Sequence, residues 1–268
     1  MERHIDVTLI GVPTKQEGND FLEILDIVDH YFTELRKVAY SSSDTINARI
    51  LNFNERNFGH RTTKKNTGVY WGIEYDKEGG FDVALRISRA EGRCKNCMIV
   101  SLEVKENWIG NTDKFLSDLI DPIAIKAKTQ SGRVHDLTDF SQQNELGPQY
   151  FKSIGKPLSE SKIKYSHIFN DYIVDLEQNP AHLHVVGAID YTAAWTMYLG
   201  ESYLQEIPVE EIHNLEAEEI VNLGKNLMRV TLFKNPFEFS KTENINRMWR
   251  FRERLRIDFI AHEKTIVY

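Results

Sequence analysis

The sequence contains few cysteines and no long apolar run. Cys94 and Cys97 are the two cysteines in 268 residues, and this lone Cys-x-x-Cys pattern lacks the second half that a zinc site requires. The first residues do not resemble a secretory signal, and no apolar run approaches the roughly 20 residues needed to cross a bilayer. We therefore expect a cytoplasmic protein without a membrane partner, and we interpret the two cysteines as structural.

Signatures of cofactor binding and covalent catalysis are also missing. The chain has no Gly-x-x-x-x-Gly-Lys-Ser/Thr loop, no Gly-x-Gly-x-x-Gly fingerprint and no Gly-x-Ser-x-Gly elbow. A net charge of −7 disfavours non-specific attraction to nucleic-acid phosphates. We therefore predict a protein that binds another macromolecule, with no catalytic residue, no cofactor and no resident metal.

The composition that remains is typical of a globular α+β protein. Hydrophobic residues make up 41% of the chain and aromatic residues 11%, which is enough for a sizeable core. We predict antiparallel β-sheet meanders with helices packed against them, arranged as two pseudo-domains at 1–127 and 163–268. The stretch 128–162 loses its periodicity, so we predict a connecting or covering loop there.

The individual elements follow from the spacing of apolar residues. Ile5, Val7 and Leu9 alternate with polar residues and predict a strand over 4–12. Asp20 and Glu23 have the capping-box spacing, which predicts the start of a helix. The other predicted elements are strands at 46–53, 69–75, 81–87, 98–104, 184–190, 194–199, 220–223 and 227–233, and helices at 111–120 and 242–260.

An enzymatic alternative rests on two neighbouring strands. Asp82 and the later Glu103-Val104-Lys105 follow the order in which nucleases of the restriction-endonuclease type hold Mg²⁺ and stabilise charge at the attacked phosphate. However, Ser101, Glu103 and Lys105 share the polar face of an amphipathic strand, where such residues are expected without catalysis. We interpret them as a solvated face and keep a Mg²⁺-dependent nuclease as an alternative function.

A histidine pair is the second pattern with possible chemistry. His182 and His184 share one face of a predicted strand, as two ligands of a metal would. No acid or histidine at a recognisable spacing completes a site, and Asp190 and His213 are the remaining candidates. We interpret the pair as structural and leave metal binding open.

Charge is distributed unevenly toward the carboxyl terminus. Residues 201–219 contain seven glutamates and no lysine or arginine, whereas residues 242–256 contain five arginines and two glutamates. The arginine-rich helix, with Trp249 and Phe251, supports a nucleic-acid-binding module as another alternative. The acidic segment offers carboxylates to a basic partner. The residues predicted to bind that partner are Tyr203, Glu210, Glu211, Glu216, Glu218 and Glu219.

The last third of the chain resembles a known family. Ala194 to Leu199 contains an aromatic W-x-x-Y-L strand, and a loop marked by Pro208 follows it. A hairpin at 220–232, the Pro236-Phe237 pair and a closing helix complete an order that resembles the immunity protein 52 family of polymorphic-toxin systems. The resemblance implies an α+β protein of the bacterial cytoplasm that binds and blocks a cognate toxin, commonly a nuclease. This is the leading hypothesis.

Overall fold

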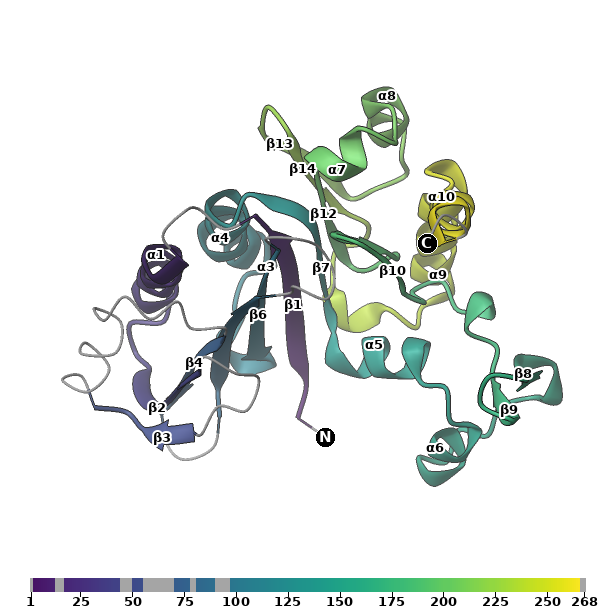
Figure 1. Cartoon of the computed structure of the whole chain (residues 1–268), viewed down its shortest axis with the longest axis horizontal. Coiled ribbons are helices and arrows are strands. Elements are labelled where there is room, and N and C mark those ends of the chain that lie inside the picture. Colours follow the sequence, from purple (N-terminus) through teal and green to yellow (C-terminus); the bar gives the residue numbers. More distant parts are fainter. Residues whose placement is uncertain are drawn as a thin grey trace.

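One antiparallel sheet of ten strands runs through the molecule (Figure 1). The computed structural model describes residues 2–12, 17–43, 50–54, 70–77, 81–89 and 97–265. Within them the strand order is β13-β14-β12-β7-β1-β6-β5-β4-β2-β3. The strands of the amino-terminal half are β1 (His4–Gly11), β2 (Arg36–Ser43), β3 (Ile50–Asn52), β4 (Tyr70–Asp76), β5 (Val83–Arg89) and β6 (Met98–Lys105).

Alternation of apolar residues explains the strands of this half. Buried residues alternate with half-buried ones along β6, so one face of the strand packs into the core. β1 pairs with β6 over its whole length, from His4 opposite Lys105 to Gly11 opposite Met98. A slip of one residue would turn the apolar face of β1 away from the core, which is why the register is well specified.

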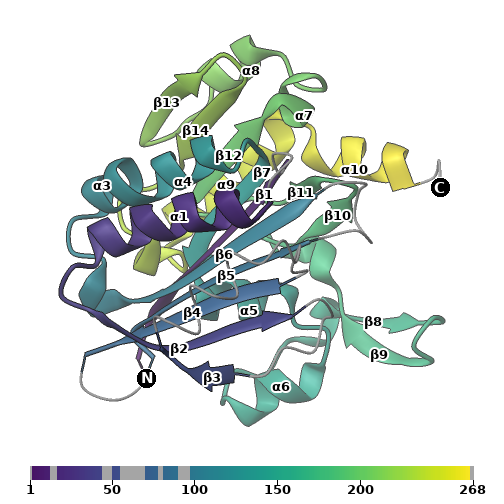
Figure 2. The same ribbon diagram turned by 60° about the vertical axis from the view of Figure 1, so that its left-hand side comes forward.

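Helices cover both faces of the sheet (Figures 1 and 2). The helices over the first face are α1 (Glu17–Tyr31), α3 (Thr112–Lys114), the π-helical η2 (Phe115–Ile120) and α4 (Asp121–Lys126), preceded by the 3₁₀ turn η1 (Glu106–Trp108). On the other face, α5 (Leu137–Asn144) contacts β1 and β7, and its Phe140 ring packs 4.4 Å from the ring of His135. Both faces of the central strands are therefore buried.

The carboxyl-terminal half extends the same sheet and adds two small hairpins. β12 (Thr196–Gly200) pairs with β7 and β14 (Leu227–Thr231), and β13 (Glu219–Gly224) forms the edge. The hairpins consist of β8 (Ile163–Ser166) with β9 (Asp171–Val174), and of β10 (His184–Val186) with β11 (Ile189–Tyr191). The helices are α6 (Pro148–Ser153), α7 (Glu201–Leu204), α8 (Val209–His213), α9 (Thr242–Arg254) and α10 (Ile257–Thr265), with 3₁₀ turns η3 (Glu160–Lys162), η4 (Leu176–Gln178) and η5 (Pro236–Glu238).

The strand β7 (Thr129–Asp136) corrects the prediction of a loop at 128–162. It lies between β1 and β12, so the predicted halves 1–127 and 163–268 share one sheet and one hydrophobic core. β7 is buried almost throughout, including Arg133, His135 and Asp136. Buried charged residues remove the apolar alternation that marks a strand, so pattern reasoning missed it. α5 and α6 occupy most of the remaining predicted loop.

Most other predictions from the pattern are confirmed, with shifted boundaries. The α+β class is correct, and the strands predicted at 4–12 and 98–104 are β1 and β6. The first helix begins at Glu17 and ends at Tyr31, because residues 36–43 form the unpredicted strand β2. Residues 46–49 of the predicted strand 46–53 lie outside the described residues. The described part of that strand contains β3. In the described ranges, no helix combines the length and apolar character that a membrane span needs.

Candidate functional site

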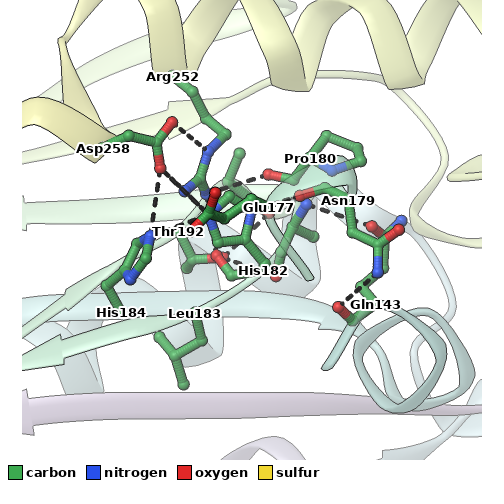
Figure 3. Close-up of polar contacts among 12 residues, drawn as sticks. Gln143, Glu177, Asn179, Pro180, His182, Leu183, His184, Thr192, Arg252 and Asp258 are labelled. Atoms are coloured by element: carbon green, nitrogen blue, oxygen red, sulfur yellow. Dashed lines mark hydrogen bonds and ion pairs between the residues drawn. The ribbon is translucent and has the colours of Figure 1, made fainter. Parts of the chain in front are cut away.

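Two histidines, an arginine and an aspartate meet where α9 and α10 pack near the β10–β11 hairpin (Figure 3). His182 precedes β10, His184 begins it, Arg252 lies on α9 and Asp258 lies on α10. Arg256, between the helices, has a φ of 53°, a left-handed conformation that lets the chain turn sharply. The turn brings Asp258 back against Arg252. We call His182, His184, Arg252 and Asp258 the histidine cluster.

Short distances join the polar atoms of the histidine cluster. His182 Nε2 lies 2.9 Å from His184 Nε2 and 3.1 Å from Asp258 Oδ1, and His184 Nε2 lies 3.4 Å from the same oxygen. Arg252 donates to both oxygens of Asp258, from Nη2 to Oδ1 and from Nε to Oδ2 at 3.2 Å. Its Nη1 donates to the carbonyls of Pro180 and His182 at 3.1 and 2.9 Å. The guanidinium is therefore fixed from several directions.

Hydrogen bonds determine which atoms of the cluster carry protons. The carbonyl of Asn179 can only accept, so His182 donates to it through Nδ1, and a neutral His182 carries its lone pair at Nε2. Arg252 Nη2 donates to that lone pair at 2.7 Å. Burial raises the pKa of Asp258, but hydrogen bonds with His182, His184 and Arg252 and the guanidinium charge outweigh it and hold this pKa well below its usual range. Asp258 is therefore an ionised carboxylate.

The partners of the histidine pair could not be found by local spacing. The two candidates considered from the sequence are elsewhere: Asp190 forms an ion pair with Arg133, and His213 ends α8. The acid that does reach both imidazoles is Asp258, which lies on an element far along the chain. A single sequence carries no signal for that encounter, because it depends on how the last helix packs.

The cysteine pattern is described in part. Cys97 is buried immediately before β6 and is disulfide-bonded, whereas Cys94 lies outside the described residues. Because its sulfur is bonded, Cys97 is not a metal ligand in this structure. Stable disulfides are typical of oxidising compartments, so the cytoplasmic location stays a prediction.

Asp82 immediately precedes β5, and Glu103 and Lys105 lie on its partner strand β6, but each carboxylate contacts a cationic group. Asp82 Oδ1 lies 3.2 Å from Lys105 Nζ, and its Oδ2 accepts from the backbone of Lys77 at 3.0 Å. Glu103 lies 2.9 Å from His4 Nδ1 and 3.9 Å from Arg86. The metal-type cluster found among the described residues is His182, His184 and Asp258, and it includes neither Asp82 nor Glu103. The contacts favour structural ion pairs at this hairpin.

We expect purified protein supplied with Mg²⁺ or Mn²⁺ to leave plasmid DNA and RNA intact in a gel assay. Lys105 forms an ion pair with Asp82. Among the described residues, Asp82 belongs to no group of three potential metal ligands, as a Mg²⁺ site would require. Asp82→Ala and Glu103→Ala serve as controls. Cleavage that disappears in both variants would establish the nuclease alternative.

The acidic segment and the arginine-rich helix neutralise each other. The ion pairs are Glu211 with Arg254 at 2.9 Å, Glu216 with Arg250, Glu218 with Arg247 at 3.6 Å, and Glu219 with Arg229 of β14 at 2.9 Å. Glu210 is exposed and has no cationic partner among the described residues. These pairs occupy arginines that the nucleic-acid alternative requires. Each of the four paired glutamates still exposes about half of its side-chain surface to solvent. A role of the glutamates in partner binding therefore stays a prediction.

Tyr203, the predicted aromatic anchor, lies in the core. None of its surface is exposed, its hydroxyl donates to the carbonyl of Asp190 at 2.5 Å, and its ring packs against Tyr191. An anchor must be accessible to its partner, so the predicted role of Tyr203 does not fit this structure. The burial follows from the apolar face of α7, which packs on β7 and β12.

Exposed apolar side chains gather instead on the β8–β9 hairpin, which extends from the body of the molecule (Figure 2). The exposed fractions are 44% for Tyr165, 90% for Ile168, 59% for Phe169 and 64% for Tyr172. The rings of Tyr165 and Tyr172 meet edge to face at 5.4 Å, and the Tyr165 hydroxyl donates to Asn170 at 2.6 Å. We call Tyr165, Ile168, Phe169 and Tyr172 the hairpin tip. Sequence patterning assigned no element here.

No family model matches the chain, and no curated protein matches it. Among solved structures, the Pseudomonas aeruginosa T6SS protein PA0821 has a similar fold, with a TM-score of 0.55 and 7% identity over 95% of this chain and 73% of that chain. A structure of the toxic C-terminal tip of CdiA from Pseudomonas aeruginosa in complex with immune protein gives a TM-score of 0.28 and 16% identity, covering 50% of this chain and 86% of that chain. The second value is too low to carry an argument, and the first concerns the fold alone.

Proposed function

We propose that the chain is a non-catalytic immunity protein that binds and inhibits a cognate protein toxin. The observation that carries the proposal is the hairpin tip, where four large apolar side chains are exposed on a projecting element. Aromatic residues dominate protein-binding hot spots, because rigid rings bury much area at small entropic cost. A contiguous exposed apolar patch on a soluble domain marks an interaction surface.

A toxin is the partner class that the sequence supports best. Residues 194–255 resemble the immunity protein 52 family, whose members block toxins by binding them. The described acids of the nuclease alternative contact cations, which agrees with an inhibitor that performs no turnover. The similar fold of a bacterial T6SS protein agrees with a bacterial setting.

A basic nuclease is the toxin that we propose. The chain carries a net charge of −7, and a nuclease cleft must be positive to attract phosphate, so the two surfaces complement each other. The hairpin tip and the acidic α8 segment lie at different ends of the carboxyl-terminal half (Figures 1 and 2). We assign the lasting contact to the hairpin tip and an accelerating role in association to Glu210 and its acidic neighbours.

Co-expression with the product of the gene immediately upstream tests the proposal. We expect the full chain to protect cells and to copurify with that product. Phe169→Ala with Tyr172→Ala should weaken the complex by at least about 30-fold, since a single hot-spot truncation already costs about 2 kcal/mol or more. Surface plasmon resonance measures both rates, and we expect the variant to dissociate faster while its association rate stays nearly unchanged.

Matched controls separate the hairpin tip from exposure in general. Phe81→Ala removes a ring of similar exposure, 55% against 59% for Phe169, from a position just before β5. It should leave protection and affinity unchanged. Equal loss in both variants, or full protection by the hairpin variant, would move the interface elsewhere. A dimer that depends on the hairpin, without any complex with the upstream product, would assign the tip to self-association.

A further inference from the structure

The histidine cluster holds three potential ligand atoms within 3.4 Å of one another. With its Nδ1 donating to the carbonyl of Asn179, His182 carries a lone pair at Nε2, and this atom lies 3.1 Å from Asp258 Oδ1. In the metal-free protein, Arg252 Nη2 donates to both of these atoms. A bound cation would replace those two hydrogen bonds, while Arg252 Nε would keep its hydrogen bond to Asp258 Oδ2.

We propose that His182, His184 and Asp258 form a binding site for a zinc-type transition-metal dication. The spacing of their donor atoms matches such an ion. A tetrahedral Zn²⁺ with bonds of 2.0–2.1 Å requires donors about 3.3 Å apart, and the three atoms are separated by 2.9, 3.1 and 3.4 Å. The same three residues are the described group of potential ligands whose atoms lie within 4.8 Å of one another.

The donor types select the class of ion. Two imidazole nitrogens with one carboxylate oxygen suit Zn²⁺ and its neighbours in the first transition row, whereas Mg²⁺ and Ca²⁺ prefer oxygen donors. Both ends of the site also have the outer contacts typical of metal ligands. His182 donates through Nδ1 to the carbonyl of Asn179, which directs its Nε2 lone pair into the cluster. Arg252 Nε donates to Asp258 Oδ2, the oxygen outside the site, and orients the carboxylate.

Solvent reaches the site from one side. Arg252 is fully buried, whereas 24% of the His184 side chain and 41% of the Asp258 side chain are exposed. An ion can therefore enter opposite the guanidinium and keep water in its fourth position. His262 follows Asp258 by four residues on α10, and its ring lies 5.2 Å from that of His184, so the open side is lined by a third imidazole.

The positive charge of Arg252 opposes the ion and lowers its affinity relative to a site without that charge. In return, the ion would connect the β10 segment to the last helix, two parts of the chain that otherwise meet through hydrogen bonds at this point. Zinc should therefore raise the melting temperature of the protein as well as bind to it.

Titration of the metal-free full chain with Zn²⁺ by calorimetry, and with Co²⁺ by visible absorption, tests the site. We expect one ion per chain, ligand-field bands of a four-coordinate Co²⁺, a higher melting temperature with Zn²⁺, and no effect of Mg²⁺. His184→Ala should reduce the affinity at least about 10-fold and abolish the rise in melting temperature. His213→Ala, which removes a histidine from the exposed α8, should change neither.

The absence of stoichiometric Zn²⁺ binding would overturn the proposal. So would equal affinities in the His184→Ala and His213→Ala variants, because binding would then belong to other histidines. Asp258→Asn adds a second reading: it keeps the size of the side chain but removes its charge, so Co²⁺ bands should shift or disappear while far-ultraviolet circular dichroism reports whether the fold persists. Unaltered Co²⁺ bands in that variant would also overturn the proposal.

Discussion

Replacing Asp190 with alanine is expected to lower the free energy of unfolding by about 3–5 kcal/mol. Asp190 of β11 forms an ion pair with Arg133 of β7, and their side chains are 1% and 9% exposed. Removing the carboxylate leaves the guanidinium in the interior without this counter-charge, and a buried unpaired charge is far less stable than one in water. The pair also joins the β10–β11 hairpin to the centre of the main sheet, so the histidine cluster should loosen with it.

Urea denaturation followed by tryptophan fluorescence measures this effect. Asp190→Asn is the conservative control and should lose less, because an amide oxygen still accepts from Arg133. The double variant Arg133→Met with Asp190→Leu should recover most of the stability, since apolar residues of similar volume commonly replace a buried ion pair without loss. A loss below about 1 kcal/mol in Asp190→Ala, in the range of an exposed pair, would show that the pair contributes little.

The buried pair of Asp190 and Arg133 also explains why β7 could not be predicted from the sequence. β1 and β6 could be predicted because apolar residues recur at every second position along much of each strand, so the period of two is visible in the letters. β7 has the same geometry, but its buried positions include Arg133 and His135, which a pattern counts as exposed. The partners that make their burial possible, Asp190 and Asp6, lie on other strands. A single sequence does not specify those encounters.

The acidic segment was visible in the sequence, but its role was not. Seven glutamates without a lysine or arginine predict a negative surface. In the fold, α9 lies beside that segment, and three of its arginines pair with Glu211, Glu216 and Glu218. Two runs of opposite charge within one chain therefore needed to be weighed against each other. The same physical reasoning, applied to 201–219 and 242–256 together, would have predicted the pairing.

The histidine cluster and the hairpin tip lie at opposite limits of what a sequence reveals. The cluster depends on the left-handed turn at Arg256, and arginine carries no preference for that conformation. The hairpin tip belongs to a continuous stretch, Ile163 to Val174, whose tyrosines and isoleucines resemble those of any strand. Its exposure is visible only once the hairpin is seen to pair with itself alone.

Asp139→Asn is expected to stabilise the protein at pH 8 but hardly at pH 4. Asp139 lies in the first turn of α5 with 1% of its surface exposed, and its Oδ1 accepts from Gln143 at 2.9 Å. Burial raises the pKa of Asp139 from 3.8 to about 7; the hydrogen bond from Gln143 lowers it, and the charge of Asp136 raises it further. The folded protein therefore binds this proton more tightly than the unfolded chain does.

The sign of the pH dependence follows from that difference. The contribution of Asp139 to stability is fully present below pH 3.8 and is lost as the pH rises through 7, because the unfolded chain releases the proton first. At about 1.4 kcal/mol per pH unit, the loss is on the order of 4 kcal/mol above pH 7. Asparagine has no proton to release and keeps an oxygen for Gln143, so the loss disappears in the variant.

The decisive measurement is the difference in unfolding free energy between the two proteins at several pH values. Taking the difference cancels groups common to both, including His135, whose pKa burial lowers. Asp113→Asn, an exposed aspartate in the first turn of α3, is the matched control and should show no growing advantage with pH. A constant difference between pH 4 and pH 8 would mean that Asp139 is ionised in the folded protein. The interior beside Asp136 would then have to supply the positive potential that holds two neighbouring carboxylates at the start of one helix.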